Sequence, residues 1–226
     1  MRHAVILAHP DPSSFNASAA RTYVAATRAT GDESMLRDLY AIGFDPLLKA
    51  SELPWAKDFA PGTDVVAERG RLADAEVIAF FYPFWFNAPP AMLKGYVERV
   101  FGFGFGYGQA EPGTTPLLGG KLLVSVSTSG APDEWVGQTA AVEHLRADFD
   151  NHLAAVCGLT VLEHLHIGGV TPGIRADAGQ EMLGQVTALV EPHSQYFVTG
   201  LQKRCEDSHV CRCARVRLHI RVRDVE

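Results

Sequence analysis

The stretch VIAFFYPFWFNAPPAMLKGYVERVF, residues 77–101, decides the fold of this chain. Val77 to Tyr82 form an uninterrupted apolar run, which is typical of a strand buried on both faces of a parallel sheet. Pro83 has no N–H to donate and is predicted to end that strand. Prolines suit the first turn of a helix, where N–H groups lack partners, so a helix is expected over Pro90–Phe101.

An aromatic loop, Phe84 to Asn87, joins this strand to this helix. Open α/β sheets bind their ligands at the carboxyl ends of their strands, where this loop is predicted to lie. Trp85 and Phe86 could be ordinary core aromatics, but their position at a strand end favours a binding role. The loop therefore predicts a site for a flat, apolar ligand.

Short apolar runs alternate with amphipathic stretches to about residue 198, the pattern of βα units around a parallel sheet. Strands are expected over Ala4–Ala8, Ser34–Asp38, Val77–Tyr82, Lys121–Ser127 and Thr160–Ile167. Helices are expected over Phe15–Ala29, Asp64–Ala75, Pro90–Phe101, Trp135–Val156 and Ala176–Tyr196. The predicted fold class is α/β, a flavodoxin-like doubly wound five-stranded parallel sheet of order 2-1-3-4-5. Two long loops, residues 40–63 and 102–120, are expected to be functional.

Composition narrows the class of protein. The 226 residues are 47% hydrophobic and 20% charged, which are globular values, and we expect one domain over residues 1–200. A net charge of −6 gives no electrostatic footprint for nucleic acid or an anionic membrane surface. No apolar run approaches the ~20 residues of a membrane span. The four cysteines show no disulfide framework, so a cytoplasmic protein is expected.

Residues 201–226 are predicted to be a separate basic extension of unknown role. The segment 215–223 alternates basic and apolar residues, as a strand with one buried face or a basic interaction arm would. Cys205, His209, Cys211 and Cys213 match no standard zinc spacing, so no metal site is predicted there. A nonessential extension is the simplest interpretation.

Two more strand ends carry residues suited to a nucleotide. The segment His9 to Asn16 follows the first strand, and Ser13 or Ser14 could cap a helix whose free amides attract phosphate. The segment Ser127 to Ala131 offers small residues that let a ligand approach the backbone. Neither a dinucleotide fingerprint nor a P-loop follows any strand. Phosphate contacts, an aromatic platform and backbone amides in one crevice together favour a flavin nucleotide.

The motifs HPDPSSFN at residues 9–16 and YPFWFNAPPAMLKGYVERVF at residues 82–101 resemble the NAD(P)H:quinone oxidoreductase family of flavodoxin-like flavoproteins. The resemblance covers roughly residues 1–197. It implies a homodimer that carries FAD, with FMN as the alternative, and takes hydride from NADH or NADPH to reduce a quinone. The residues implied to bind the cofactor are His9, Ser14, Phe15, Asn16, Pro83, Phe84, Trp85, Phe86, Asn87, Thr128, Ser129, Gly130 and Ala131.

The same resemblance places Phe103, Phe105 and Tyr107 in the acceptor pocket. Family members often carry a Tyr and a His after the segment that corresponds to 128–131. Here Trp135 stands about where the Tyr would be, and His144 is displaced from the His position by about one helical turn. We take Trp135, His144 and Tyr107 as candidate catalytic residues, although a helix histidine such as His144 is more often a surface or packing residue.

Three functions remain open on the sequence. The first is a flavin-dependent NAD(P)H:quinone oxidoreductase acting on a quinone or similar flat small-molecule acceptor. The alternative is a flavin-bound ancillary regulatory subunit of a transport system, which the altered Tyr/His pair favours. The third is a flavodoxin-like carrier, which the aromatic segment GFGFGYG at 102–108 disfavours.

Overall fold

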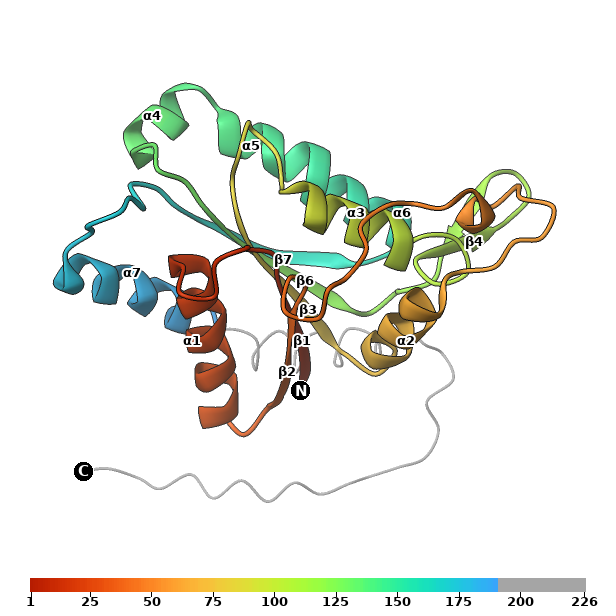
Figure 1. The fold of residues 1–226 in the computed structure, drawn as a ribbon, viewed down its shortest axis with the longest axis horizontal. Helices are drawn as coiled ribbons and strands as arrows, with labels where there is room; N and C mark the ends of the chain where they lie inside the picture. Colours follow the sequence, from red (N-terminus) through yellow and green to blue (C-terminus); the bar gives the residue numbers. More distant parts are fainter. Residues whose placement is uncertain (191–226) are drawn as a thin grey trace, which may run out of the picture. The chain divides into compact units, whose positions relative to one another are not determined.

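Five parallel strands form the central sheet of the computed structural model, which describes residues 1–190 (Figure 1). The strands are β1 (Arg2–Leu7), β2 (Glu33–Asp38), β3 (Val77–Pro83), β6 (Leu122–Thr128) and β7 (Thr160–Ile167). Their order is β2-β1-β3-β6-β7, and every neighbouring pair is parallel. This confirms the predicted 2-1-3-4-5 sheet. The chain reverses direction across the sheet between β1 and β3, so the loops after these strands border one crevice.

Helices cover both faces of the sheet (Figure 1). On one face lie α1 (Phe15–Ala29) and α7 (Ala176–Ala188), which contact each other. The other face is covered by α2 (Thr63–Leu72), α3 (Ala91–Val100), α5 (Ala141–Leu145) and α6 (His152–Cys157). A short helix, α4 (Asp133–Gln138), follows β6.

Strand β3 explains why two layers of helices are needed. All seven of its residues are buried. Successive side chains point to opposite faces of a strand, so Ile78, Phe80 and Tyr82 pack on the α3 side while Ala79 and Phe81 pack on the α1 side. A strand without polar residues is stable only when both of its faces are covered.

The single helix predicted over Trp135–Val156 is wrong. Helix α4 ends at Gln138, where the Thr139 hydroxyl donates to the Trp135 carbonyl at 3.1 Å, and Ala140 then adopts a left-handed φ of 51°. The helix resumes as α5, passes through a π-helical turn, η2 (Arg146–Asn151), and continues as α6. Hydrophobic periodicity cannot reveal a hydroxyl that closes a helix or a one-turn change of pitch.

The two long loops are ordered against the domain. Loop 40–63 contains a 3-10 turn, η1 (Ala50–Glu52), and loop 102–120 contains an antiparallel pair, β4 (Tyr107–Gln109) and β5 (Thr114–Pro116). The buried guanidinium of Arg99 on α3 binds the carboxylates of Glu52 and Asp64, at 2.7 Å each, and so fastens the first loop to the α2 and α3 helices.

Two expectations concern residues outside the described range. One is the end of the last predicted helix, beyond residue 190. The other is the basic extension at 201–226, with its cysteines and His209. Within residues 1–190, none of the helices combines the length and hydrophobicity that spanning a bilayer requires.

Candidate cofactor site

A cavity of about 120 Å³ opens where three strands of the sheet end. Its lining comes from the last residues of β3 and β6, from the segments that follow β1, β3 and β6, and from Val170 after β7. The structure therefore brings the three predicted strand ends together. The lining residues are His9, Ser14, Phe15, Asn16, Pro83, Trp85, Thr128, Ser129, Gly130 and Val170.

The first wall is the amino end of α1. Ser14 is the N-cap, and its hydroxyl accepts a hydrogen bond from the Ala17 amide at 3.2 Å. The first turn of α1 contains no acidic residue. The carboxylate of Asp11, which could repel an anion, is occupied by the amide and hydroxyl of Ser13 at 2.8 and 2.7 Å. The first-turn amides and the helix dipole are therefore suited to a phosphate group.

Asn16 offers a polar atom without a partner. The side chain is 3% exposed, and its amide nitrogen donates to the Thr128 hydroxyl at 2.8 Å. The amide oxygen Oδ1 is buried and accepts no hydrogen bond from the described residues. An orphaned buried acceptor costs about 1–3 kcal/mol, so this atom calls for a hydroxyl or N–H from a bound molecule. A ribityl hydroxyl of a flavin fits that need, whereas a phosphate oxygen, itself an acceptor, does not.

The second wall is a tight hairpin after β3. The backbones of Trp85 and Ala88 exchange two hydrogen bonds, at 3.2 and 3.1 Å, while Phe86 and Asn87 between them have φ values of 50° and 56°. Trp85 is 46% exposed, lines the cavity and lies 5.7 Å from the His9 ring. Phe86 points fully into solvent, and neither Phe86 nor Asn87 lines the cavity. Only one of the three predicted ring-flanking residues 85–87 thus faces the site.

Phe84 also lies off the cavity. It is buried and makes an edge-on contact with the His166 ring at 5.7 Å. Phe84, predicted to flank a flavin, therefore packs in the core and does not line the cavity.

The third wall is the loop after β6, fixed by the loop after β7. The Val170 and Gly169 amides donate to the carbonyls of Ser129 and Ala131 at 2.9 and 2.8 Å. The Ser129 amide donates to Ile167, whereas Gly130 and Ala131 have amides that bond to none of the described residues. Ala131 itself does not line the cavity. Val170 was missed, because no sequence pattern marks a loop that crosses over a neighbouring strand end.

The three candidate catalytic residues lie elsewhere. Trp135 on α4 is half exposed, and His144 on α5 is exposed. Tyr107 begins β4 and lines a different cavity. None of the three lines the cavity at the strand ends, so the structure does not bring them to the predicted cofactor site.

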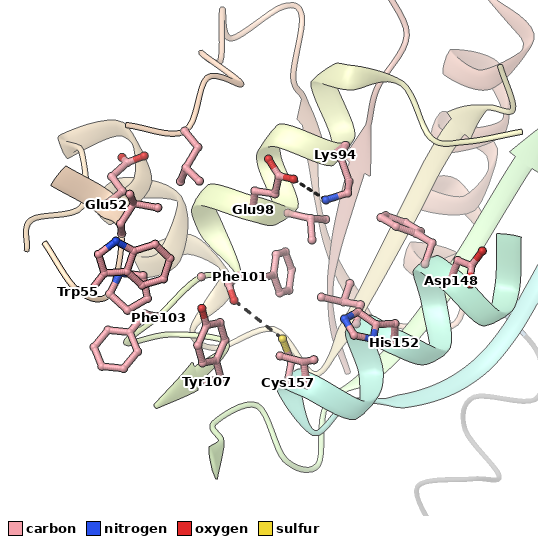
Figure 2. A pocket seen from close by; sticks show the side chains of 18 residues that line it. Glu52, Trp55, Lys94, Glu98, Phe101, Phe103, Tyr107, Asp148, His152 and Cys157 are labelled. Carbon is pink, nitrogen blue, oxygen red and sulfur yellow. Dashed lines mark hydrogen bonds and ion pairs between the residues drawn. The ribbon is translucent and has the colours of Figure 1, made fainter. Parts of the chain in front are cut away.

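Figure 2 shows that second cavity, of about 360 Å³, between α3, α6 and loop 40–63. Trp55, Phe103 and Tyr107 gather at one end of it, and the Lys94–Glu98 ion pair lies at another part of its wall. Two of the three predicted acceptor-pocket aromatics thus line it, while Phe105 packs against the core instead. The two cavities share no lining residue.

Sequence reasoning also missed a set of buried polar side chains behind Ser129. Ser125 and Ser127 on β6 face His164 and His166 on β7 across the sheet register, next to Asp150 of η2. Ser127 bonds to both histidines, at 2.7 and 2.8 Å. The signal was present: polar residues alternate along β6 and β7 inside apolar runs. For residues 1–190, no group of three or more potential metal ligands is found.

Comparison with known proteins places this geometry in context. The family model described as flavodoxin-like fold matches residues 1–190. An uncharacterized NAD(P)H oxidoreductase of Haemophilus influenzae is 29% identical over 75% of this chain and 85% of its own length. NAD(P)H dehydrogenase [quinone] 1 of Rattus norvegicus is 26% identical over 87% of this chain and 80% of its own.

Solved structures agree on the fold. The NAD(P)H:quinone oxidoreductase of Methanothermobacter marburgensis superposes with a TM-score of 0.71 at 22% identity, covering 85% of this chain and 95% of its own. An FMN-dependent NADH-azoreductase of Bacillus anthracis in complex with FMN has a TM-score of 0.64 at 17% identity, covering 84% of this chain and 97% of its own.

Proposed function

Because the chain belongs to the flavodoxin-like fold family and, within it, to the NAD(P)H:quinone oxidoreductase family, we propose a flavin-dependent oxidoreductase. It takes hydride from NADH or NADPH and passes it through a bound flavin to a quinone or similar flat acceptor. The enzyme class, an NAD(P)H dehydrogenase of the quinone type, is the one its relatives carry in their names. The flavin, the acceptor and the roles of single residues are our proposal.

One observation carries the proposal. The cavity at the strand ends combines the amino end of α1, the orphaned Asn16 oxygen and the exposed face of Trp85 in one place. These suit, in turn, a phosphate, a hydroxyl and a flat apolar ring. A flavin mononucleotide unit contains all three.

Each wall then has its own task. The first-turn amides of α1 would bind the phosphate, and Asn16 Oδ1 would accept a hydrogen bond from a ribityl hydroxyl. Trp85 would cover one face of the ring and exclude water from it. The Gly130 amide would donate to the pyrimidine side of the ring, where negative charge gathers on reduction, as donors do in an oxyanion hole. The flavin, when bound, supplies the hydride chemistry.

FAD is the cofactor we favour from the family resemblance, and FMN is the alternative. The FMN complex of the Bacillus anthracis structure supports a flavin site in this fold without choosing between the two. We also propose a homodimer, since Trp55 and Leu48 leave apolar surface exposed at the second cavity. Sedimentation at micromolar concentration tests the dimer. A cytoplasmic location stays a prediction.

The decisive experiment is the visible absorption spectrum of protein purified under native conditions and after incubation with FAD or FMN. We expect bound flavin, and a bleached flavin band on anaerobic addition of NADH or NADPH. A quinone should then restore the band. Protein that binds neither flavin contradicts the proposal. Flavin that binds but is never reduced by either nicotinamide instead supports the ancillary regulatory role.

A further inference from the structure

A continuous chain of hydrogen bonds runs through the core and ends at the cofactor cavity. It starts at the buried Asp150 of the π turn, whose Oδ2 is hydrogen-bonded to His164 Nδ1. Its remaining links are His164 Nε2 to Ser127 Oγ at 2.7 Å, Ser127 Oγ to His166 Nδ1 at 2.8 Å, and His166 Nε2 to Ser129 Oγ at 3.0 Å. Ser129 lines the cavity. No link is broken between Asp150 and the site.

Local structure explains this alignment. Ser127 lies on β6, and Ser129 follows two residues later, just after the strand ends at Thr128. Ser127 shares a face with His164 and His166 of β7, because Ser127 pairs with His166 in the register. Asp150 belongs to the π turn η2, and its side chain is hydrogen-bonded to His164 on this face of the sheet. Ser125 binds the other carboxylate oxygen of Asp150 at 2.7 Å and anchors it from outside the path. π turns inside helices are rare and often occur at functional sites.

The residue types Asp150, His164 and Ser127 match a nucleophilic triad, but the geometry does not. Ser127 is 0% exposed and its hydroxyl bonds to two imidazoles, so no substrate reaches it. A buried polar chain of this length is costly unless every member is satisfied. What this one offers is a connection between a buried acid–base pair and the cavity.

The chain can be polarised in two ways. In the first, outward state, Asp150 and His164 share an extra proton, and every hydrogen bond points toward the cavity. His164 Nε2 donates to Ser127, Ser127 donates to His166 Nδ1, and His166 Nε2 donates to Ser129. Ser129 Oγ then donates beyond the chain, as it does here to the Ala131 carbonyl at 3.0 Å. In the second, inward state, Asp150 is a carboxylate, and every hydrogen bond points toward it. Ser129 donates to His166 Nε2, His166 Nδ1 donates to Ser127, Ser127 donates to His164 Nε2, and His164 Nδ1 donates to Asp150. The second state holds one proton fewer than the first.

We propose that this chain carries one proton between the Asp150–His164 pair and the flavin bound in the cavity, by switching between these two polarities. Four hops along the chain remove one proton from the pair and release one at Ser129 Oγ, so protons balance. Hydride transfer to the flavin would leave one negative charge on it, which the released proton would neutralise. When the flavin gives its hydride to the acceptor, its proton would return along the same path, and the reduced acceptor would take its own proton from water. The inference rests on the proposed function, because it needs a flavin at Ser129.

His166 reports the polarity. Burial lowers the pKa of His166 to about 4, an effect that His164 reinforces and Asp133 opposes. It is therefore neutral near pH 7, with its single proton on Nε2 in the outward state and on Nδ1 in the inward state. Among residues 1–190, two further titratable groups interact with the chain: Asp133 of α4 acts on His166, and the Tyr82 ring of β3 contacts the His164 ring. Burial and Asp150 raise the pKa of Tyr82, which stays protonated.

The test is nitrogen-15 NMR of the histidine side chains in flavin-bound protein, oxidised and then reduced by dithionite without any nicotinamide. A His166→Gln variant assigns the signal. We expect the His166 proton on Nε2 with oxidised flavin and on Nδ1 with reduced flavin. In Ser127→Ala the switch should be lost, and in Ser127→Thr it should return. Ser125→Ala, which cuts no link of the path, is the matched control and should keep the switch.

The same tautomer in both redox states of the wild type overturns the proposal, and so does a switch that persists in Ser127→Ala. Since the wild-type measurement stands alone, misfolding of a variant does not remove the test. If no flavin binds, the proposed function fails and this inference fails with it. If flavin binds and His166 does not switch, the relay alone is refuted.

Discussion

The turn after β3 shows how single residues shape the site. Phe86 and Asn87 both adopt positive φ angles, which cost non-glycine residues on the order of 1–3 kcal/mol each. The sequence Phe-Asn is not one of the glycine-containing pairs that announce such a turn. In this turn Trp85 lines the cavity, whereas Phe86 points into solvent. Neighbouring aromatics that look equivalent in the sequence therefore have different tasks.

Replacing Trp85 should separate these tasks. Trp85→Ala removes ring stacking worth on the order of 1 kcal/mol, so flavin affinity should fall about fivefold. The melting temperature should change little, because Trp85 is half exposed. Flavin fluorescence titration measures the first effect and thermal denaturation the second. Phe86→Ala is the matched control: an equal loss of affinity in it would show that the hairpin and not the Trp85 ring carries the effect.

At the scale of elements, apolar runs predicted the sheet well, and they predicted the helices less well. Strands β3 and β6 follow directly from their hydrophobic runs, because both faces of a central strand are buried. Strand β7 was predicted over its observed residues although it lies at the edge of the sheet and is only partly buried. The break at Ala140 and the π turn depend on one hydroxyl and one buried carboxylate, which no periodicity encodes. The three strand-end segments were predictable for the same reason as the strands, whereas Val170 and the polar chain depend on which strands become neighbours.

Helix α3 and loop 40–63 meet at a position where only glycine fits. A Cβ on Gly95 would lie 2.1 Å from the Pro46 carbonyl oxygen, which is backbone and cannot turn away. Gly95→Ala should therefore destabilise the protein by about 1–3 kcal/mol, as overpacking does. Urea denaturation measures the loss.

Gly70 on α2 is the control for that variant, since a Cβ there meets nothing within 4 Å. Gly70→Ala should stabilise the protein by up to about 1 kcal/mol through helix propensity alone. A Gly95→Ala protein as stable as Gly70→Ala would mean that the loop does not rest on α3.

Over the whole molecule, one buried cation fastens the longest loop to the domain. Arg99 is 2% exposed and binds both Glu52 and Asp64. Its hydrogen bonds lower the pKa of Glu52 to about 2 from 4.5, against the opposing effect of burial. Because the folded pKa lies below the unfolded one, this contribution to stability is complete above about pH 4.5 and disappears as the pH falls toward 2.

Glu52→Gln should flatten that acid dependence. At neutral pH the variant leaves Arg99 short of one charge, so we expect a loss of about 3–5 kcal/mol in the free energy of unfolding. The difference between the variant and the wild type should shrink below about pH 4.5 and close as the pH falls to about 2. Urea denaturation at a series of pH values checks both statements. Glu98→Gln removes only the exposed pair with Lys94 and should change stability by less than about 1 kcal/mol at any pH. Parallel curves for Glu52→Gln and the wild type would contradict the assignment.

The π turn also has a meaning for the length of the chain. A π turn is an α-helical segment that has gained one residue, so its register is advanced by one position relative to a plain helix. Deleting one exposed residue, such as Ala147, would restore an ordinary helix. Because the wide turn absorbs the extra residue, the deletion would leave α5 and α6 in register with each other and would change the placement of side chains within the turn, Asp150 among them. A single codon therefore separates a helix that merely covers the sheet from one that delivers a carboxylate into it.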